Sequence, residues 1–373
     1  MNMKESYTPQ NSNSMDVIIT APSLDTRINV SGVSSVVRFI IDNNPEYRYL
    51  HFQLGKTDKQ KGGIRRIKAT LKALKNWHDI LKQNQYAIIH YSFPLSKPSL
   101  LRDPLFMWLA KKHKRKMVIH VHGGLFLTKK KISFLWMKIL RWVFGWDVPF
   151  IVLSENEAKT LKNRFGAKQV EVLPNCVDLK EAEVFHRFNN CDSKESLIRI
   201  GYLGRIEQNK GITELLKACV KLKEAGIPFK LEMAGKEAKE NEYLPSFSKK
   251  LGNNFHYAGV VFGEDKVSFL KRLDVFVLPS YFEGLPMSLL ECMSYGCVPV
   301  VTPVGSIPEV VTDRENGMLI KVHDVNSIVN MIIFLYEHRD LMMCMGKNAR
   351  NTIFSQYNPK NYIERLNVLY RSL

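Results

Sequence analysis

The feature that most constrains the fold of this chain is a regular alternation of short apolar runs with helical segments. Apolar, β-branched runs separated by helical patterns are typical of a parallel sheet covered by helices on both faces. We predict twelve such strands, at 16–20, 49–53, 87–91, 117–121, 150–153, 170–173, 197–203, 229–234, 256–260, 275–278, 298–302 and 317–320.

The alternation is interrupted once, by a polar stretch over 178–196 without clean periodicity. A chain of 373 residues is also long for a single core. We therefore predict an α/β architecture of two Rossmann-like, doubly wound domains facing a central cleft. The predicted boundaries are a disordered extension over 1–14, domains at 15–178 and 197–357, a linker at 179–196, and a terminal helix at 358–373. That helix packs on its own domain or crosses back to the first.

Charge is distributed unevenly between the two halves. The net charge is +18, and residues 1–190 carry 31 Lys and Arg against 15 Asp and Glu, whereas residues 191–373 carry 23 against 21. A basic first half attracts anionic partners, or it is a solvated surface that maintains solubility. Six cysteines without CxxC spacing, no secretory leader and no apolar run of about 20 residues predict a cytoplasmic protein.

The stretch from Glu283 to Glu291, EGLPMSLLE, carries the strongest chemical signal. Pro286 suits the first position of a helix, whose free N–H groups and dipole favour anions or hydroxyls. Glu283 lies beside that helix start, and Glu291 lies one to two turns into the helix, where a carboxylate can bind vicinal hydroxyls. Taken alone, such a pair is more often a helix cap and a surface ion pair.

A second motif, GRIEQNKG, runs from Gly204 to Gly211 and follows a predicted strand. Arg205 and Lys210 offer a planar guanidinium and a compact ammonium, which together suit a diphosphate. Alone, the loop is equally an ordinary solvated turn. Its position at the carboxyl end of a strand, where α/β domains bind ligands, favours the functional interpretation.

Several further stretches follow in a fixed order: LPNCVD at 173–178, DVFVLPS at 274–280, CMSYGCVP at 292–299, VGSIPE at 304–309 and Asn316-Gly317. Together with the two motifs above, they resemble the retaining glycosyltransferases of family 4, which have the GT-B fold. The resemblance is dense over 173–320 and thinner before it. It implies a hexosyltransferase that uses a nucleotide-sugar, UDP- or GDP-linked, with retention of anomeric configuration and without a covalent nucleophile.

The resemblance also implies roles for individual residues. Arg205 and Lys210 would hold the donor diphosphate and stabilise its developing charge, and Glu291 would bind the ribose. Glu283 and the adjoining backbone would bind the transferred sugar, and His122 would face that sugar from the first domain. The implied catalytic residues are Arg205, Lys210, Glu283 and His122, and the implied donor-binding residues are Gly32, Asn175, Arg205, Lys210, Glu283, Gly284, Leu285, Pro286 and Glu291.

In the first domain, one turn departs from the family's sequence and a second histidine lies near His122. The family's Gly-Gly turn is Ser31-Gly32 here, and His120 precedes His122 by two residues, which places both on the same face of an extended strand. A lone histidine after an apolar strand is often structural, so the glycine pair after His122 and its place in the order support the functional interpretation. His120 is the second choice.

No Asp-x-Asp pair occurs in the sequence. We therefore expect no metal and no cofactor, with Arg205 and Lys210 in place of a divalent cation.

The basic first domain is the expected acceptor side. Basic, Trp-rich amphipathic helices lie at anionic membrane surfaces. We predict a peripheral enzyme on the cytoplasmic face of the membrane that glycosylates a lipid-linked saccharide in polysaccharide or glycoconjugate assembly. The alternative is that the aromatic residues of this region, such as Trp136 and Trp142, are buried in the hydrophobic core. The residues assigned to acceptor or membrane are Lys111, Lys112, Lys114, Arg115, Lys116, Lys129, Lys130, Lys131, Trp136 and Trp142.

Two rival functions remain at this stage. A nucleotide-sugar epimerase or phosphorylase would keep the fold and change the reaction. A nucleic-acid-binding protein would account for the pI of about 9.5, but no helix-turn-helix, RNP or zinc-finger pattern is present, so nucleic acid is not an expected partner.

Overall fold

The computed structural model describes residues 15–25, 29, 31–55, 64–129, 131–185 and 197–373. Contacts divide the chain into two compact units, 1–174 with 360–373 and 175–359. The predicted extension over 1–14, most of the predicted linker (186–196) and Lys130 lie outside the described residues.

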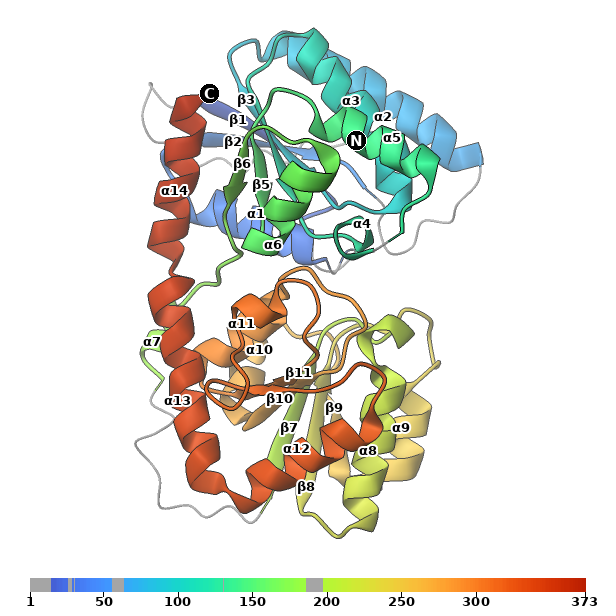
Figure 1. Ribbon diagram of the computed structural model, residues 1–373, viewed down its shortest axis with the longest axis vertical. Coiled ribbons are helices and arrows are strands. Elements are labelled where there is room, and N and C mark those ends of the chain that lie inside the picture. Colours follow the sequence, from blue (N-terminus) through green and yellow to red (C-terminus); the bar gives the residue numbers. More distant parts are fainter. Residues whose placement is uncertain (1–14, 26–28, 30, 56–63, 130, 186–196) are drawn as a thin grey trace. The chain divides into compact units, whose positions relative to one another are not determined.

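The first unit is a six-stranded sheet in the order β2-β1-β3-β4-β5-β6, with every neighbouring pair parallel (Figure 1). The strands are β1 (Asp16–Ala21), β2 (Arg48–Gln53), β3 (Ile88–Phe93), β4 (Met117–Val121), β5 (Phe150–Val152) and β6 (Val170–Val172). The helices are α1 (Gly32–Asn43), α2 (Ile64–Gln83), α3 (Lys97–Lys112), α4 (Leu125–Thr128), α5 (Phe134–Phe144) and α6 (Glu155–Thr160), which continues as a π-helical turn over Leu161–Phe165.

Strand alternation separates the two faces of this sheet. Tyr91 and Phe93 point into an apolar core that includes Trp77 of α2 and Phe106 of α3. The Trp77 indole donates to the Phe106 carbonyl at 2.9 Å, so this large ring keeps a partner for its N–H group. His90, between these core positions, points to the opposite face.

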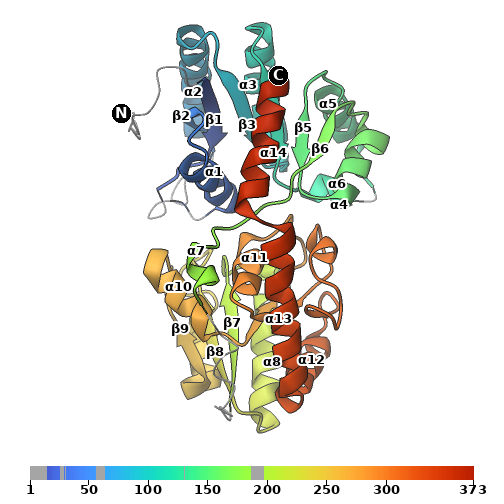
Figure 2. The same cartoon turned by 90° about the vertical axis from the view of Figure 1, so that its left-hand side faces the viewer.

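The opposite face carries the C-terminal helix α14 (Pro359–Ser372), which belongs to the first unit from Lys360 onward (Figure 2). Asn367 and Asn44 exchange side-chain hydrogen bonds of 2.7 and 3.3 Å, both side chains being buried. Tyr362 packs edge-on against Phe39 of α1. The last helix of the chain is thus part of the first unit's structure.

The second unit repeats the plan with the order β12-β11-β10-β7-β8-β9, again parallel throughout. Its strands are β7 (Ile198–Leu203), β8 (Phe229–Ala234), β9 (Phe255–Tyr257), β10 (Val275–Leu278), β11 (Val298–Val301) and β12 (Met318–Leu319). Its helices are α7 (Lys180–Glu183), α8 (Ile212–Glu224), α9 (Leu244–Leu251), α10 (Gly263–Arg272), α11 (Met287–Ser294), α12 (Val325–Glu337) and α13 (Arg339–Gln356).

The predicted pair of doubly wound, parallel-sheet α/β domains and all twelve predicted strands are confirmed, with ends shifted by a few residues. One local expectation differs: α11 begins at Met287, so Pro286 precedes the helix as its N-cap instead of occupying its first position. Its φ of −68° is compatible with either position. None of the helices in the described part of the chain combines the length and apolarity needed to cross a membrane.

Candidate active site

The loop after β7 is held in place by glycines that admit no side chain. A Cβ on Gly211, whose φ is +70°, would lie 2.1 Å from the Pro279 carbonyl oxygen. A Cβ on Gly235 would lie 1.7 Å from the Gly204 carbonyl oxygen. These close backbone approaches fix the 204–211 loop against the ends of β8 and β10.

Lys210 and Glu283 form the centre of the site. The Lys210 Nζ atom lies 2.7 Å from Glu283 Oε1, and Ser280 Oγ donates to the same oxygen at 2.7 Å. The Glu283 side chain is 8% exposed and that of Lys210 is 22% exposed. A carboxylate this deeply buried needs such partners, so the two sequence motifs, 73 residues apart, meet through a charge-assisted contact.

The backbone beside Glu283 is equally constrained. Gly305 has a φ of +60°, and a Cβ there would lie 2.1 Å from the Glu283 carbonyl oxygen. Ser306 N–H donates to the Gly284 carbonyl at 3.0 Å. The buried Asn175 donates from Nδ2 to the Leu285 carbonyl at 2.8 Å, so it positions this turn from within the second unit.

Glu291, in the second turn of α11, has a partner that sequence reasoning missed. Lys266 Nζ, on α10, lies 2.8 Å from Glu291 Oε1. The pKa of Lys266 is raised, chiefly by the charge of Glu291 and against the effect of burial. The two residues are 25 positions apart and belong to no common motif, so no local signal could have paired them.

Arg205 follows β7 and its side chain is exposed. Its main-chain carbonyl accepts a hydrogen bond from the buried Tyr202 hydroxyl. The second unit therefore places Arg205 and Lys210 on one loop and brings Lys210, Glu283 and Ser280 into direct contact, with Glu291 on the following helix.

In the first unit, His122 lies directly beyond β4, and its ring stacks on that of His120 with centroids 4.1 Å apart. Burial lowers the pKa of His122 to about 3, so its imidazole is neutral near pH 7. The two glycines after it are required, because both have positive φ and a Cβ on Gly124 would lie 2.6 Å from the Leu95 carbonyl oxygen. Gly32 opens α1, and a Cβ there would meet nothing within 4 Å.

The basic residues assigned to an acceptor divide into two groups. Lys111, Lys112, Lys114, Lys116, Lys129 and Lys131 are exposed. Arg115 differs, because its guanidinium donates to the Leu81 carbonyl at 2.9 Å and also to the Gln85 carbonyl, both near the end of α2. Its contacts are those of a helix C-terminal cap, which gives Arg115 a structural role beside the acceptor contact predicted for it.

The apolar side chains of α5 also fall into two groups, one half-buried and one exposed. Trp136 is half-buried and packs on Phe126, so the structure places it with the core. Phe134, Leu135 and Trp142 are 75%, 63% and 49% exposed. A second exposed apolar row, absent from the sequence analysis, lies on α3, which packs against α5: Leu101, Leu105 and Trp108 are 63%, 48% and 47% exposed.

Two family models match consecutive parts of the chain. Residues 41–181 match the model described as Glycosyltransferase Family 4, and residues 186–352 match that described as Glycosyl transferases group 1. The second match spans both motifs of the candidate site.

Individual proteins agree with the family models. The UDP-Gal:alpha-D-GlcNAc-diphosphoundecaprenol alpha-1,3-galactosyltransferase of Escherichia coli is 26% identical over 80% of this chain and 79% of its own length. Among solved structures, a sucrose-phosphate synthase from Thermosynechococcus elongatus superposes with a TM-score of 0.76 at 17% identity, covering 96% of this chain and 98% of that one. HepE from Anabaena, in complex with UDP and glucose, gives 0.71 at 16% identity, covering 96% and 100%.

Proposed function

The chain belongs to the glycosyltransferases of family 4, with the GT-B fold, and from this premise we propose that it transfers a hexosyl or N-acetylhexosaminyl group from a UDP- or GDP-sugar to a lipid-linked saccharide. The family makes it a nucleotide-sugar-dependent glycosyltransferase. The sugar, the base, the acceptor and retention of configuration are parts of the proposal.

The observation that carries the proposal is the buried contact between Lys210 and Glu283 at 2.7 Å. It joins the cation expected at the diphosphate to the carboxylate expected at the sugar. Within this pair, each charge neutralises the other. We propose that a bound donor replaces this pairing, with its diphosphate beside Lys210 and a sugar hydroxyl donating to Glu283.

Glu291 would bind the ribose while its own ion pair stays in place. Its carboxylate is held by Lys266 at 2.8 Å, and Oε1 is the oxygen engaged. Vicinal hydroxyls could donate to the carboxylate while Lys266 keeps its charge compensated. An ionised carboxylate accepts hydrogen bonds more strongly than a neutral acid does.

The proposed reaction breaks the bond between the sugar and the diphosphate. The acceptor oxygen forms the new bond on the same face, and the acceptor hydroxyl's proton passes to the departing phosphate oxygen. Positive groups placed beforehand at the leaving diphosphate stabilise its developing charge. Arg205 and Lys210 supply that charge. Neither Glu283 nor Glu291 is proposed as a nucleophile, because both are assigned to donor binding.

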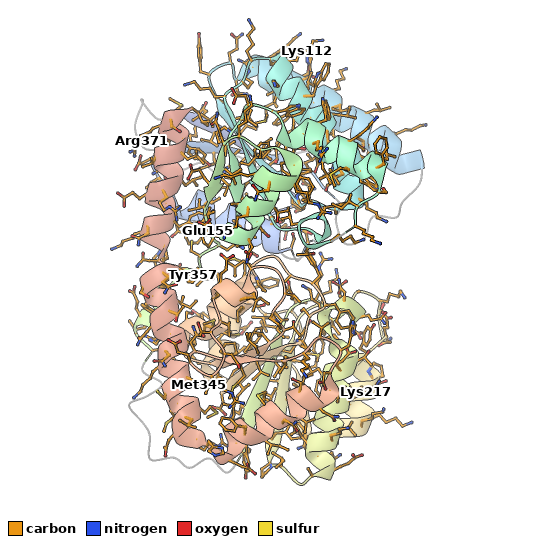
Figure 3. All side chains as sticks on the ribbon, in the orientation of Figure 1. Lys112, Glu155, Lys217, Met345, Tyr357 and Arg371 are labelled. Carbon is orange, nitrogen blue, oxygen red and sulfur yellow. The ribbon has the colours of Figure 1, made fainter. Side chains whose placement is uncertain are left out.

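The lipid-linked acceptor is supported by the exposed surface of the first unit and by the undecaprenol-linked substrate in the name of the Escherichia coli relative. Lys112, labelled in Figure 3, ends α3 beside Trp108, and its Nζ lies 5.3 Å from that ring. Lys138 Nζ lies 4.5 Å from the exposed Phe134 ring. Apolar side chains interleaved with lysines suit the interface of an anionic bilayer, so we propose a peripheral position on the membrane.

The proposal is tested by product analysis. The protein is incubated with a panel of UDP- and GDP-sugars, with and without a diphosphate-lipid saccharide, and the product is examined by NMR. We expect one donor to release its nucleoside diphosphate in an acceptor-dependent manner and the new linkage to keep the donor's configuration. A nucleotide-sugar isomer formed without acceptor would instead identify an epimerase, and an inverted linkage would overturn retention.

A further inference from the structure

Polar residues of α14 and of the first sheet form a continuous series of contacts that ends at His122. Tyr370 Oη on α14 lies 2.7 Å from His90 Nδ1, and His90 Nε2 lies 3.1 Å from His120 Nδ1. The His120 ring then stacks on His122 with an interplanar angle of 28°. The C-terminal helix, which lies against the first sheet in Figure 2, is thereby linked through two histidines to His122, the ring that the family resemblance places at the sugar.

The strand pattern explains why these groups meet. His90 on β3 and His120 on β4 both alternate with core residues, and both are fully buried. They therefore point away from the apolar core, toward the face that carries α14. On that face Tyr370 supplies the hydroxyl, and Asn44 donates to the neighbouring Tyr49 hydroxyl at 2.9 Å.

The chemistry of neutral imidazoles couples the members of this chain. Burial lowers the pKa of His90 to about 3 and that of His120 well below its usual range, so each ring has one donor and one acceptor nitrogen near pH 7. Burial also raises the pKa of Tyr370, which therefore keeps its proton. If Tyr370 donates to His90, then His90 donates to His120 and the His120 proton lies on Nε2. The reverse direction places it on Nδ1.

Two nitrogens at the far end of the chain have no hydrogen-bond partner among the described residues, His120 Nε2 and His122 Nε2. Both are buried. An unpaired buried nitrogen is costly, and here one lies on the last ring of the hydrogen-bonded series and the other on the ring stacked against it. That location is where a ligand hydroxyl could pair with them.

We propose that Tyr370, His90 and His120 are positioning residues, which fix the orientation of His122 and the proton arrangement that an incoming sugar meets. This inference rests on the proposed function and on the family resemblance, which places His122 at the transferred sugar. It assigns the C-terminal helix a part in the reaction, because Tyr370 lies on that helix.

The first test is Tyr370→Phe, which removes the hydroxyl and keeps the ring. Losing one buried hydrogen bond from the chain is expected to lower kcat about fivefold to tenfold, with the KM for the donor nearly unchanged. The matched control is Tyr362→Phe on the same helix, whose ring is also buried but lies outside the chain. It is expected to retain wild-type kcat.

A double-variant comparison separates positioning from general stability. In a His122→Ala background, Tyr370→Phe is expected to cause no further loss of kcat, because its effect passes through His122. An equal fractional loss in both backgrounds would overturn the proposal, as would wild-type kcat in Tyr370→Phe itself.

A readout without turnover keeps this test distinct from that of the proposed function. The ¹⁵N NMR shifts of the histidine rings in the free protein report which nitrogen carries the proton. Tyr370→Phe is expected to change the tautomer signals of His90 and His120, and Tyr362→Phe is not. Unchanged signals would overturn the proposal even in an active enzyme. Changed signals in a protein that transfers no sugar would mean that the proposed function has failed, although the hydrogen bonds from Tyr370 through His90 to His120 are present.

Discussion

The two units share one plan, a six-stranded parallel sheet with helices on both faces, but they assemble their polar groups differently. In the second unit, the candidate site lies within two short stretches, and tight glycine turns bring Lys210 to Glu283. In the first unit, the polar chain draws on residues as far apart as His90 and Tyr370, 280 positions along the sequence. The second unit's central contact joins two loops that each follow a strand, whereas the first unit's polar series also depends on where the C-terminal helix packs.

The largest effect is expected where a charge is left unpaired in the second unit. Lys210→Met should lower turnover about 100- to 1,000-fold, because it removes the positive charge proposed to lie beside the leaving diphosphate. It should also lower the free energy of unfolding by about 3 kcal/mol, since Glu283 loses its counter-ion. Turnover assays and denaturant unfolding measure the two effects. Lys217→Met, which alters an exposed lysine on α8 (Figure 3), is the control.

The double variant Lys210→Met with Glu283→Gln sharpens that result. Removing both charges should restore most of the lost stability while turnover stays low. If stability does not recover, the pair is not the cause of the loss, and a recovery of turnover would remove Lys210 from the catalytic role.

A second prediction concerns the apolar surface that distinguishes the first unit. Replacing Leu105 and Trp108 together by serine should weaken binding to anionic vesicles by at least about tenfold, because two large apolar contacts with the bilayer interface are lost. Vesicle co-sedimentation measures this. Phe262→Ser alters a side chain of the second unit that is 39% exposed, and it should leave binding unchanged. Equal binding of the wild type, the Leu105 and Trp108 double variant and Phe262→Ser to vesicles would exclude the proposed membrane surface. Binding that does not depend on anionic lipid would exclude it too.

A third prediction uses the buried histidines of the first unit. Their pKa values in the folded protein lie below the usual 6.5, with His90 and His122 at about 3. The unfolded chain therefore binds more protons, and stability should fall as the pH drops from about 6.5 toward 4. Burial raises the pKa of Asp103 to about 6, and this shift offsets the effect of one histidine on the pH dependence of stability. The free energy of unfolding should fall by about 1.4 kcal/mol per pH unit for each histidine that is not offset in this way.

Hydrogen exchange between pH 7 and 5 locates this loss. Amides of β3 and β4, which carry His90 and His120, should lose more protection than amides of β7 and β10. Protection that falls equally in both sheets would mean that these histidines do not distinguish the units.

The smallest effect is expected from metal removal. Arg205 and Lys210 are proposed to stand in for a cation at the diphosphate, so treatment with EDTA should leave turnover within about twofold of the untreated enzyme. Loss of activity that Mg²⁺ or Mn²⁺ restores would contradict that part of the mechanism.

The sequence predicts most of this fold because the strands are apolar runs bounded by polar turns, a pattern that the buried parallel sheets preserve. It does not predict α4 or the π-helical turn after α6, which are short and lack a clear period of their own. In α5, apolar residues occur all around the helix, so spacing could not separate the half-buried Trp136 from the exposed Trp142.

Pairings between distant residues were beyond sequence reasoning. The motifs indicate that Lys210 and Glu283 share a site, but not that they contact each other. Lys266 carries no motif at all, and its contact with Glu291 follows from the packing of α10 beside α11. The spacing of His120 and His122 predicts a shared face, which the stacked rings show, whereas the link to Tyr370 depends on where the C-terminal helix packs.

The central claim is that the second unit binds the nucleotide-sugar through its two glutamates and two cations. Thermal unfolding of the wild type and of Glu291→Ala in the presence of a UDP- and GDP-sugar panel tests it most directly. At 100 times the Kd, a bound donor should stabilise the wild type by about 2.7 kcal/mol. Glu291→Ala should lose most of that stabilisation and still unfold cooperatively without donor. Equal stabilisation of both proteins, or none of the wild type by any donor, would contradict the claim.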